Sequence, residues 1–200
     1  MDGIALPVVL MFLLIITISA VYSIRRSTLA EGITRNQLDY EVARQSAEAA
    51  LRDAERDLFA SYTVKPTAAL CDRSTDRPLK DKLVAGLWET TCPKGQCRVS
   101  PDYLVSSNYA TKANPQPWWP ASKDGLWGNN ENLANCTFSG GVPIGTFTGT
   151  PNVSGVARQP EYLIEWIDRG SDPVMRITAR GFGADLNTEV VLQSYVRPPN

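Results

Sequence analysis

Residues 4–24 read IALPVVLMFLLIITISAVYSI, a run of 21 residues without a charged side chain. At about 1.5 Å per residue, a helix of this length covers the ~30 Å hydrocarbon core of a bilayer. A cleaved secretory signal has a shorter apolar region, which is followed by a small-residue cleavage site. Here Arg25-Arg26 leads directly into further helix-forming sequence. The run therefore predicts a membrane-spanning helix that continues past the membrane. A plain transmembrane anchor is the alternative.

Residues 27–60 continue the helix as an amphipathic segment. Leu38, Val42, Ala49 and Leu58 mark apolar positions. Mostly small residues form a stripe at spacings of three and four, which places them on one helix face: Ala43, Ala47, Ala50, Leu51 and Ala54. Small side chains allow a second element to approach closely. We therefore expect a single stem, lipid-soluble in its first half and packed on a domain in its second.

The composition excludes several classes of function. The chain has 20 basic and 21 acidic residues, so no overall charge favours nucleic acid. It contains no histidine, the commonest general base and metal ligand. No serine lies in a nucleophile-elbow sequence, and the carboxylates are interpreted as scattered over surface-type helix and turns. The prediction is a protein that is not an enzyme and has no metal and no cofactor.

Four cysteines, Cys71, Cys92, Cys97 and Cys136, follow the apolar run. An even number after an export-type start predicts two disulfides formed in an oxidising compartment. Reduced buried thiols and zinc ligation are the alternatives. Of the three pairings, we favour Cys92–Cys97 with Cys71–Cys136, because a Pro-Lys-Gly turn lies between Cys92 and Cys97. Loop entropy predicts stabilisation of about 2 and about 4 kcal/mol respectively.

Residues 61–160 are rich in proline, glycine, asparagine and serine, which predicts a loop-rich region that needs such crosslinks. Trp118, Trp119 and Trp127 lie in this region. Tryptophan is enriched at interface hot spots, so these three form a candidate partner surface. Packing of the loops onto the helix and sheet is the alternative, and the one we favour.

Beyond Pro160 the pattern alternates between apolar and polar residues. Three strands are predicted at 161–168, 173–180 and 188–196, and one or two more within 95–106. An antiparallel meander with one face on the amphipathic helix buries both apolar surfaces. The fold class is thus α+β, a long N-terminal helix packed on a C-terminal antiparallel sheet.

Several motifs resemble those of a known family. Gly3-Ile-Ala-Leu6, the apolar run and Thr17 resemble the start of class III prepilins. Residues 31–36 and 43–55 resemble the N-terminal signature of PilX minor pilins, and residues 176–183 and 189–194 resemble that family's closing strands. The resemblance covers residues 3–58 and 161–197. It implies a pilin-like roll, and it supports the favoured disulfide pairing.

The resemblance also implies a processing site and a division of the chain. A prepilin peptidase would cut between Gly3 and Ile4, and the new amine of Ile4 would be N-methylated. Residues 1–3 would be the leader remnant, 4–26 the transmembrane and assembly half of the helix, and 27–200 a periplasmic domain. That domain would comprise the helix 27–60, the disulfide region 61–160 and the meander 161–197.

Two positions depart from the pattern of major pilins. Val8 occupies the fifth mature position, where major pilins have a glutamate that pairs with the terminal ammonium of a neighbouring stem. A chain lacking that carboxylate fits best at or near a filament tip; PilX proteins and the secretion pseudopilin GspK resemble it in this. A simple lipid-facing anchor residue is the alternative. The leader, Met1-Asp2, has no basic residue, and Arg25-Arg26 favours the opposite orientation under the positive-inside rule.

The implied function is structural. The chain would join other minor pilins in a priming or tip complex for type IV pilus assembly, contact the major pilin through its N-terminal helix, and support a PilY-type adhesin. It would reside in the bacterial inner membrane with its domain in the periplasm, and then in the pilus at the cell surface. The alternatives are a GspK-like pseudopilin of a type II secretion system and a bitopic periplasmic binding protein.

Overall fold

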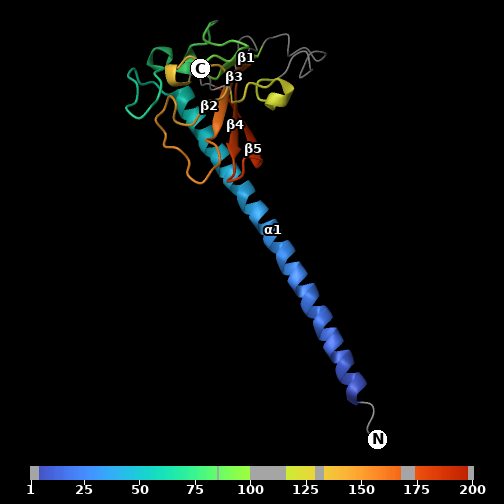
Figure 1. Ribbon diagram of the computed structural model, residues 1–200. Helices are drawn as coiled ribbons and strands as arrows, with labels where there is room; N and C mark the ends of the chain where they lie inside the picture. The colour runs from blue at the N-terminus through green and yellow to red at the C-terminus, as the bar shows by residue number, and fades with distance from the viewer. Residues whose placement is uncertain (1–4, 85, 100–115, 129–132, 168–173, 198–200) are drawn as a thin grey trace, which may run out of the picture. The chain divides into compact units, whose positions relative to one another are not determined.

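The computed structural model describes residues 5–84, 86–99, 116–128, 133–167 and 174–197. By its internal contacts the chain divides into two units, Met1–Asp39 and Tyr40–Asn200. One α-helix, α1, runs from Ala5 to Phe59 and contributes to both units (Figure 1). The stem helix predicted from the sequence is therefore present.

The other described elements are short. The 3-10 helices are η1 (Ser74–Asp76), η2 (Leu79–Asp81), η4 (Ala121–Lys123) and η5 (Leu133–Asn135). The strands are β1 (Gln96–Val99), β2 (Val142–Pro143), β3 (Glu161–Ile167), β4 (Val174–Phe182) and β5 (Glu189–Val196). Among the described residues of the 61–160 region, loops join these elements, as the turn-forming composition predicts.

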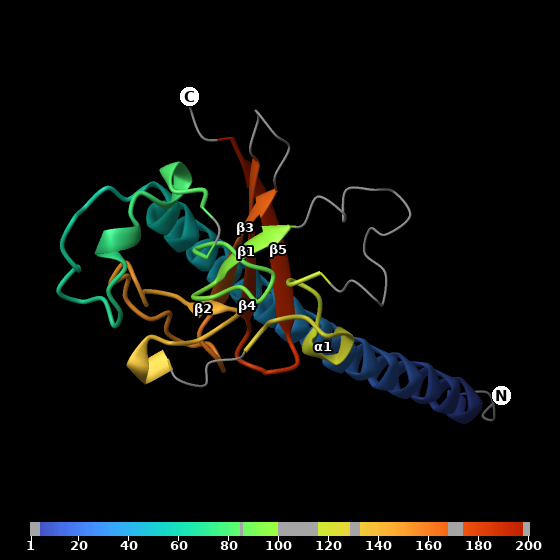
Figure 2. The same cartoon turned by 90° about the horizontal axis from the view of Figure 1, so that it is seen from above.

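The strands form one five-stranded sheet in the order β1-β3-β4-β5, with β2 also pairing with β3 (Figure 2). The pairs β3–β4 and β4–β5 are antiparallel, so the predicted meander is confirmed. The additional strand β1 runs parallel to β3, which makes the complete sheet mixed. A long connection separates these two strands along the chain, which leaves room for the crossover that parallel pairing needs. The rest of the predicted 95–106 strand region lies outside the described residues.

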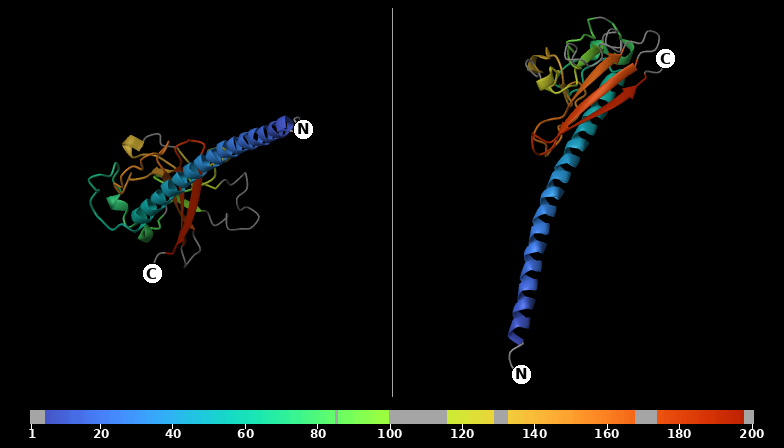
Figure 3. Two further views of the ribbon diagram at one scale, coloured as in Figure 1. Left: turned by 90° about the horizontal axis from the view of Figure 1, so that it is seen from below. Right: turned by 90° about the vertical axis from the view of Figure 1, so that its right-hand side faces the viewer.

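The second half of α1 packs along one face of the sheet, with β3, β4 and β5 beside it (Figure 3). The small-residue stripe faces the sheet, and Ala43, Ala47, Ala50 and Ala54 are fully buried. Tyr162, Ile164, Met175, Ile177 and Ala179 alternate along β3 and β4 and contribute to the same core. Leu58 is buried there as well, whereas Leu38, in the first unit, is 66% exposed. Packing thus begins one turn later than the apolar pattern suggested.

Helix and sheet approach each other closely at Gly181 on β4. A Cβ atom added there would lie 2.2 Å from the backbone nitrogen of Ala47 and 2.4 Å from the carbonyl oxygen of Ala43. The Ser46 hydroxyl accepts a hydrogen bond from the Phe182 N–H at 3.0 Å and donates to the Phe182 carbonyl at 3.2 Å. Only glycine on the strand and small residues on the helix permit this contact.

Candidate functional site

The first half of α1 presents an apolar surface. Within the described residues, α1 is the one helix long and apolar enough to cross a membrane, judged by length and composition. Its large apolar side chains from Leu6 to Ile24 are all more than 45% exposed, and Val8 is 47% exposed. Two hydroxyls in this stretch are satisfied locally. Thr17 donates to the Leu13 and Leu14 carbonyls, and Ser19 donates to the Ile15 carbonyl. Such a surface can exchange lipid contacts for contacts with another apolar helix. Gly3 and Ile4 lie outside the described residues.

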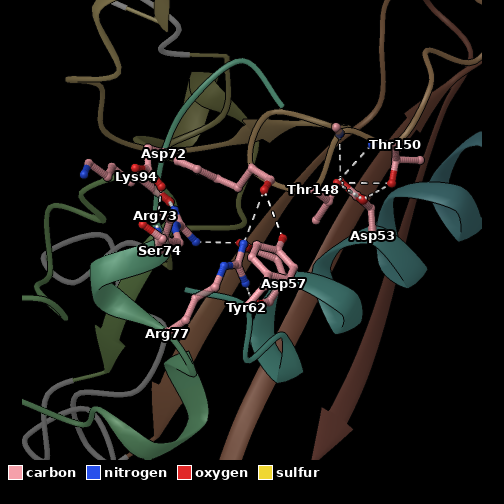
Figure 4. Close-up of polar contacts among 12 residues, drawn as sticks. Asp53, Asp57, Tyr62, Asp72, Arg73, Ser74, Arg77, Lys94, Thr148 and Thr150 are labelled. Carbon is pink, nitrogen blue, oxygen red and sulfur yellow. Dashed lines mark hydrogen bonds and ion pairs between the residues drawn. The ribbon is translucent and has the colours of Figure 1, made fainter. Parts of the chain in front are cut away.

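The last two turns of α1 carry two buried carboxylates, Asp53 and Asp57 (Figure 4). They lie on the same face as Ala50 and Ala54, at the spacings that place side chains on one stripe. A buried carboxylate is costly unless it is fully hydrogen-bonded or paired. Each of the two has enough partners, and together they attach the end of the helix to two separate loops.

Asp57 is held by two arginines and a tyrosine. Its carboxylate oxygens lie 2.6 Å from an Nη atom of Arg73 and 2.6 Å from one of Arg77, and all three side chains are at most 1% exposed. The Tyr162 hydroxyl donates to Oδ2 at 2.9 Å, and Arg77 also donates to the Asp57 carbonyl at 2.6 Å. Burial raises the pKa of Tyr162 well above its usual value, and the nearby Asp57 and Asp53 carboxylates raise it further. The phenol is therefore a stable donor to Asp57.

Asp53 binds the loop that follows β2. It accepts hydrogen bonds from the Gly145 N–H at 2.8 Å and from the Thr148 and Thr150 hydroxyls at 2.5 Å each. Three donors converge on one buried carboxylate, which orients the loop against the helix. No group of three or more acidic, cysteine or histidine side chains in the described part of the chain is arranged to hold a metal ion.

A second set of buried charges lies on the sheet face that points away from α1. Glu165 of β3 is paired with Arg176 of β4 at 2.6 and 2.8 Å, and Glu161 is paired with Arg180 at 2.5 Å. Both pairs follow the strand register, in which these residues are direct partners. Burial raises the pKa of Glu165, and the hydrogen bond from Arg176 opposes that shift. The interpretation of the carboxylates as surface residues is therefore wrong for Asp53, Asp57, Glu161 and Glu165.

Both disulfides favoured from the sequence are present. Cys71 is bonded to Cys136 across 65 residues, and Cys92 to Cys97 across five. Both disulfides are connected to Arg73, a partner of Asp57. Cys71 is two residues from Arg73 along the chain, and Arg73 donates a hydrogen bond to the carbonyl of Lys94, inside the Cys92–Cys97 turn. The crosslinks thus constrain the loops that supply the partners of the helix carboxylate.

The three tryptophans of the candidate partner surface lie mainly in packed environments. Trp127 is 5% exposed and packs with Cys92, Cys97 and Leu163. Its indole N–H donates to the Trp118 carbonyl at 2.7 Å. Trp118 and Trp119 are half-buried. The packing interpretation is thus correct for Trp127, which has almost no surface to offer a partner.

The sequence contains signals that point to the buried contacts of Asp53 and Asp57. Asp53 and Asp57 each lie three residues after an alanine of the buried stripe, Ala50 and Ala54, and so fall on the same helix face. Because a buried carboxylate needs a partner, their position predicts a buried ion pair or hydrogen bonds. Arg73 and Arg77 repeat the same spacing of four within a loop held by Cys71. What the pattern does not reveal is which of the arginines in the chain reach the helix.

The comparisons with known proteins agree with this architecture. The family model described as type IV pilus assembly protein PilX, C-terminal, matches residues 67–198, and the one described as PilX N-terminal matches residues 2–52. No curated protein and no solved structure matches the chain. The two family matches together span the apolar stem, the buried helix end with its disulfide loops, and the sheet, so the chain belongs to the PilX family of type IV pilus assembly proteins.

Proposed function

We propose that this chain is a minor pilin that acts in a priming or tip complex with other minor pilins. Its family takes part in type IV pilus assembly and is structural rather than catalytic. The proposal is carried by the exposed, uncharged stretch of α1 from Leu6 to Ile24, with Val8 at the place of the pilin glutamate. The proposal includes inner-membrane residence before assembly, a periplasmic second unit, support of a PilY-type adhesin and no catalytic activity of its own.

The role of Val8 follows from the electrostatics of a bundle of stems. Cleavage between Gly3 and Ile4 makes Val8 the fifth residue of the mature chain. A terminal ammonium buried among apolar helices costs several kcal/mol unless a carboxylate neutralises it. A stem with valine at this position offers no such carboxylate to the next subunit. Such a stem therefore suits a position at the end of a fibre, where no neighbouring ammonium needs its carboxylate.

The processing step is tested on the full chain purified from cells that contain a prepilin peptidase. We expect N-terminal sequencing and mass spectrometry to find N-methylated Ile4 as the first residue. An intact Met1 in those cells would contradict the minor-pilin proposal and favour a permanent anchor. Thiol labelling in whole cells tests the compartment: all four cysteines should resist alkylation until they are reduced.

The position in the fibre is tested with two glutamate variants in a strain that lacks the native gene. Val8→Glu supplies a carboxylate that can pair with a neighbouring amine, whereas Val9→Glu places the same charge on the adjacent residue, which is 56% exposed in the monomer. We expect Val8→Glu to be incorporated along the fibre in more copies than wild type, and Val9→Glu to be excluded. Quantitative immunolabelling of sheared pili measures both. Equal behaviour of the two variants would refute the role of Val8.

A further inference from the structure

The two edges of the sheet are protected to different degrees. At one edge, β1 forms an isolated parallel bridge with Glu89, whose carbonyl accepts a hydrogen bond from the Arg98 N–H at 2.9 Å. The short strand β2 ends in Pro143, which has no N–H to offer. At the other edge, β5 pairs with β4 (Figure 1). Within the described part of the chain, β5 is a long edge strand without a second neighbour.

The register shows which backbone groups of β5 point out of the sheet. The Gly183 N–H donates to the Thr188 carbonyl at 2.9 Å, so these two residues form a hydrogen-bonded pair that continues the β4–β5 ladder. Such pairs alternate with pairs that are not hydrogen-bonded. The N–H and carbonyl groups of every second residue of β5 therefore point away from β4, and all four of these residues are exposed: Glu189, Val191, Gln193 and Tyr195.

Strand β5 lacks the features that usually keep an edge strand from pairing. Edge strands are commonly interrupted by a lysine, a proline or a bulge. From Val190 to Val196 the strand reads VVLQSYV, without a charge, a proline or a glycine. Each residue of β5 faces one residue of β4, so no bulge interrupts the strand. Uncharged segments of this length that are rich in β-branched and aromatic residues pair readily with another strand.

The sequence of this edge is complementary to itself in the antiparallel direction. With Gln193 opposite Gln193 of a second copy, Val191 lies opposite Tyr195 in both halves of the pair. Val191 and Tyr195 are 40% and 60% exposed, and a β-branched residue opposite an aromatic one is a favourable cross-strand pair. Glu189 is the charged residue of β5 and lies at its start, so its two copies are at opposite ends. A shift of the register by two residues would place valine opposite glutamine instead.

We propose that β5 is a self-association edge, at which the β5 strands of two copies pair antiparallel about Gln193. Residues 191, 193 and 195 of the two strands exchange about six backbone hydrogen bonds. The two five-stranded sheets then form one continuous sheet, and the contact is isologous because each copy offers the same surface. The edge belongs to the second unit, so this association does not depend on the tip role proposed above.

Helix α1 leaves room for this pairing. Ala43 and Ala47 approach the sheet at Gly181, which lies on β4 and not on the edge strand. The β4 strands of two paired copies are three strand spacings apart, about 14 Å. Packed helices need only about 8–10 Å between their axes. The two copies of residues 40–59 run in opposite directions, so this pairing is separate from the packing of parallel stems.

Engineered cysteines test the register in the full chain in detergent micelles. All four native cysteines are disulfide-bonded, so a new cysteine supplies the free thiol. Gln193→Cys should form an intermolecular disulfide under mild oxidation, because the two Cα atoms of a hydrogen-bonded pair lie about 5.5 Å apart. Val191→Cys is the matched control, since its two copies are about 14 Å apart along the edge. Val191→Cys mixed with Tyr195→Cys should link again, and equal linking of all variants would overturn the proposal.

Charged variants test whether the edge drives the association. Gln193→Lys and Gln193→Glu each place like charges opposite one another, and each should weaken dimerisation roughly tenfold or more. An equimolar mixture of the two variants should restore a dimer. Gln45→Lys, at an exposed position on α1, is the control and should leave dimerisation unchanged. Sedimentation measures the dimer, and unchanged tryptophan fluorescence checks that each variant is folded.

Two results of the sedimentation experiment would contradict the self-association edge. A wild-type chain that remains monomeric up to the highest concentration reached would show that the edge does not pair with itself. A dimer that Gln193→Lys leaves intact would assign the association to the apolar stems. Neither result affects the assembly role, which is tested separately by the processing at Ile4.

Discussion

Replacing Asp57 by asparagine tests how the helix is attached to its domain. The substitution keeps the shape of the side chain but removes the charge that lies 2.6 Å from both Arg73 and Arg77. Breaking a buried ion pair by removing one partner costs about 3–5 kcal/mol, because the remaining charge is left unpaired. Here two guanidinium groups lose their counterion at once. We therefore expect the upper part of that range.

The expected loss is large compared with the total stability of a domain, about 5–15 kcal/mol. For a unit of this size, Tm falls by roughly 2–4 °C for each kcal/mol of lost stability. A loss of about 4–5 kcal/mol should therefore lower Tm by roughly 8–20 °C. Tryptophan fluorescence is a suitable probe for thermal and urea unfolding. All five tryptophans lie in the second unit, so the signal is insensitive to the first half of α1.

The matched control is Glu48→Gln, on the same helix. Glu48 is 35% exposed and lies 2.6 Å from Arg44, so its pair is partly solvated. Pairs of this kind contribute less than about 1 kcal/mol. A double-mutant cycle of Asp57→Asn with Arg77→Met should show coupling above about 1 kcal/mol. The reasoning fails if Asp57→Asn costs no more than Glu48→Gln, or if the two changes in the cycle are simply additive.

Three further predictions concern packing, crosslinks and pH. Gly181→Ala should cost about 1–3 kcal/mol in urea denaturation, because its Cβ would clash with helix backbone; Gly32→Ala, with nothing within 4 Å, should raise helicity by circular dichroism. Serine replacement of Cys71 and Cys136 should cost about 4 kcal/mol, against about 2 for Cys92 and Cys97; equal losses would contradict the loop-entropy argument. Because burial raises the pKa of Tyr162, the unfolded phenol ionises first, near pH 10. Unfolding free energy should then fall above pH 10 by up to about 1.4 kcal/mol per pH unit, and less steeply in Tyr162→Phe.

Local patterns in the sequence were sufficient to predict the main helix and the three C-terminal strands. A run of 21 uncharged residues sets the length of a membrane span, and alanines three and four apart mark the buried helix face. The alternation of apolar and polar residues predicted both ends of β3, β4 and β5 to within two residues. The turn between Cys92 and Cys97 was sufficient to favour their pairing. Each of these signals depends on neighbours along the chain, which is why the sequence alone could reveal them.

The functional features of the second unit depend on residues that are distant in sequence. Strand alternation places Glu161 and Glu165 on one face of the sheet. That face is buried only because loops, including the one that carries Trp127, cover it. The parallel pairing of β1 with β3 needs a crossover that no local pattern encodes. The orientation of the buried Gln116 amide is set by Arg176, 60 residues away, which donates a hydrogen bond to its oxygen.

Helix α1 also combines a part that is predictable from local sequence with a part that depends on distant residues. The sequence alone predicts that residues 4–24 form an apolar helix, because their length and lack of charge suffice for that. How the other end of the helix is held depends on tertiary contacts. Asp57 can be buried because Arg73, Arg77 and Tyr162 converge on it from a loop and a strand. A buried charge is stable only when its partners are already in place, and the fold is what brings them there.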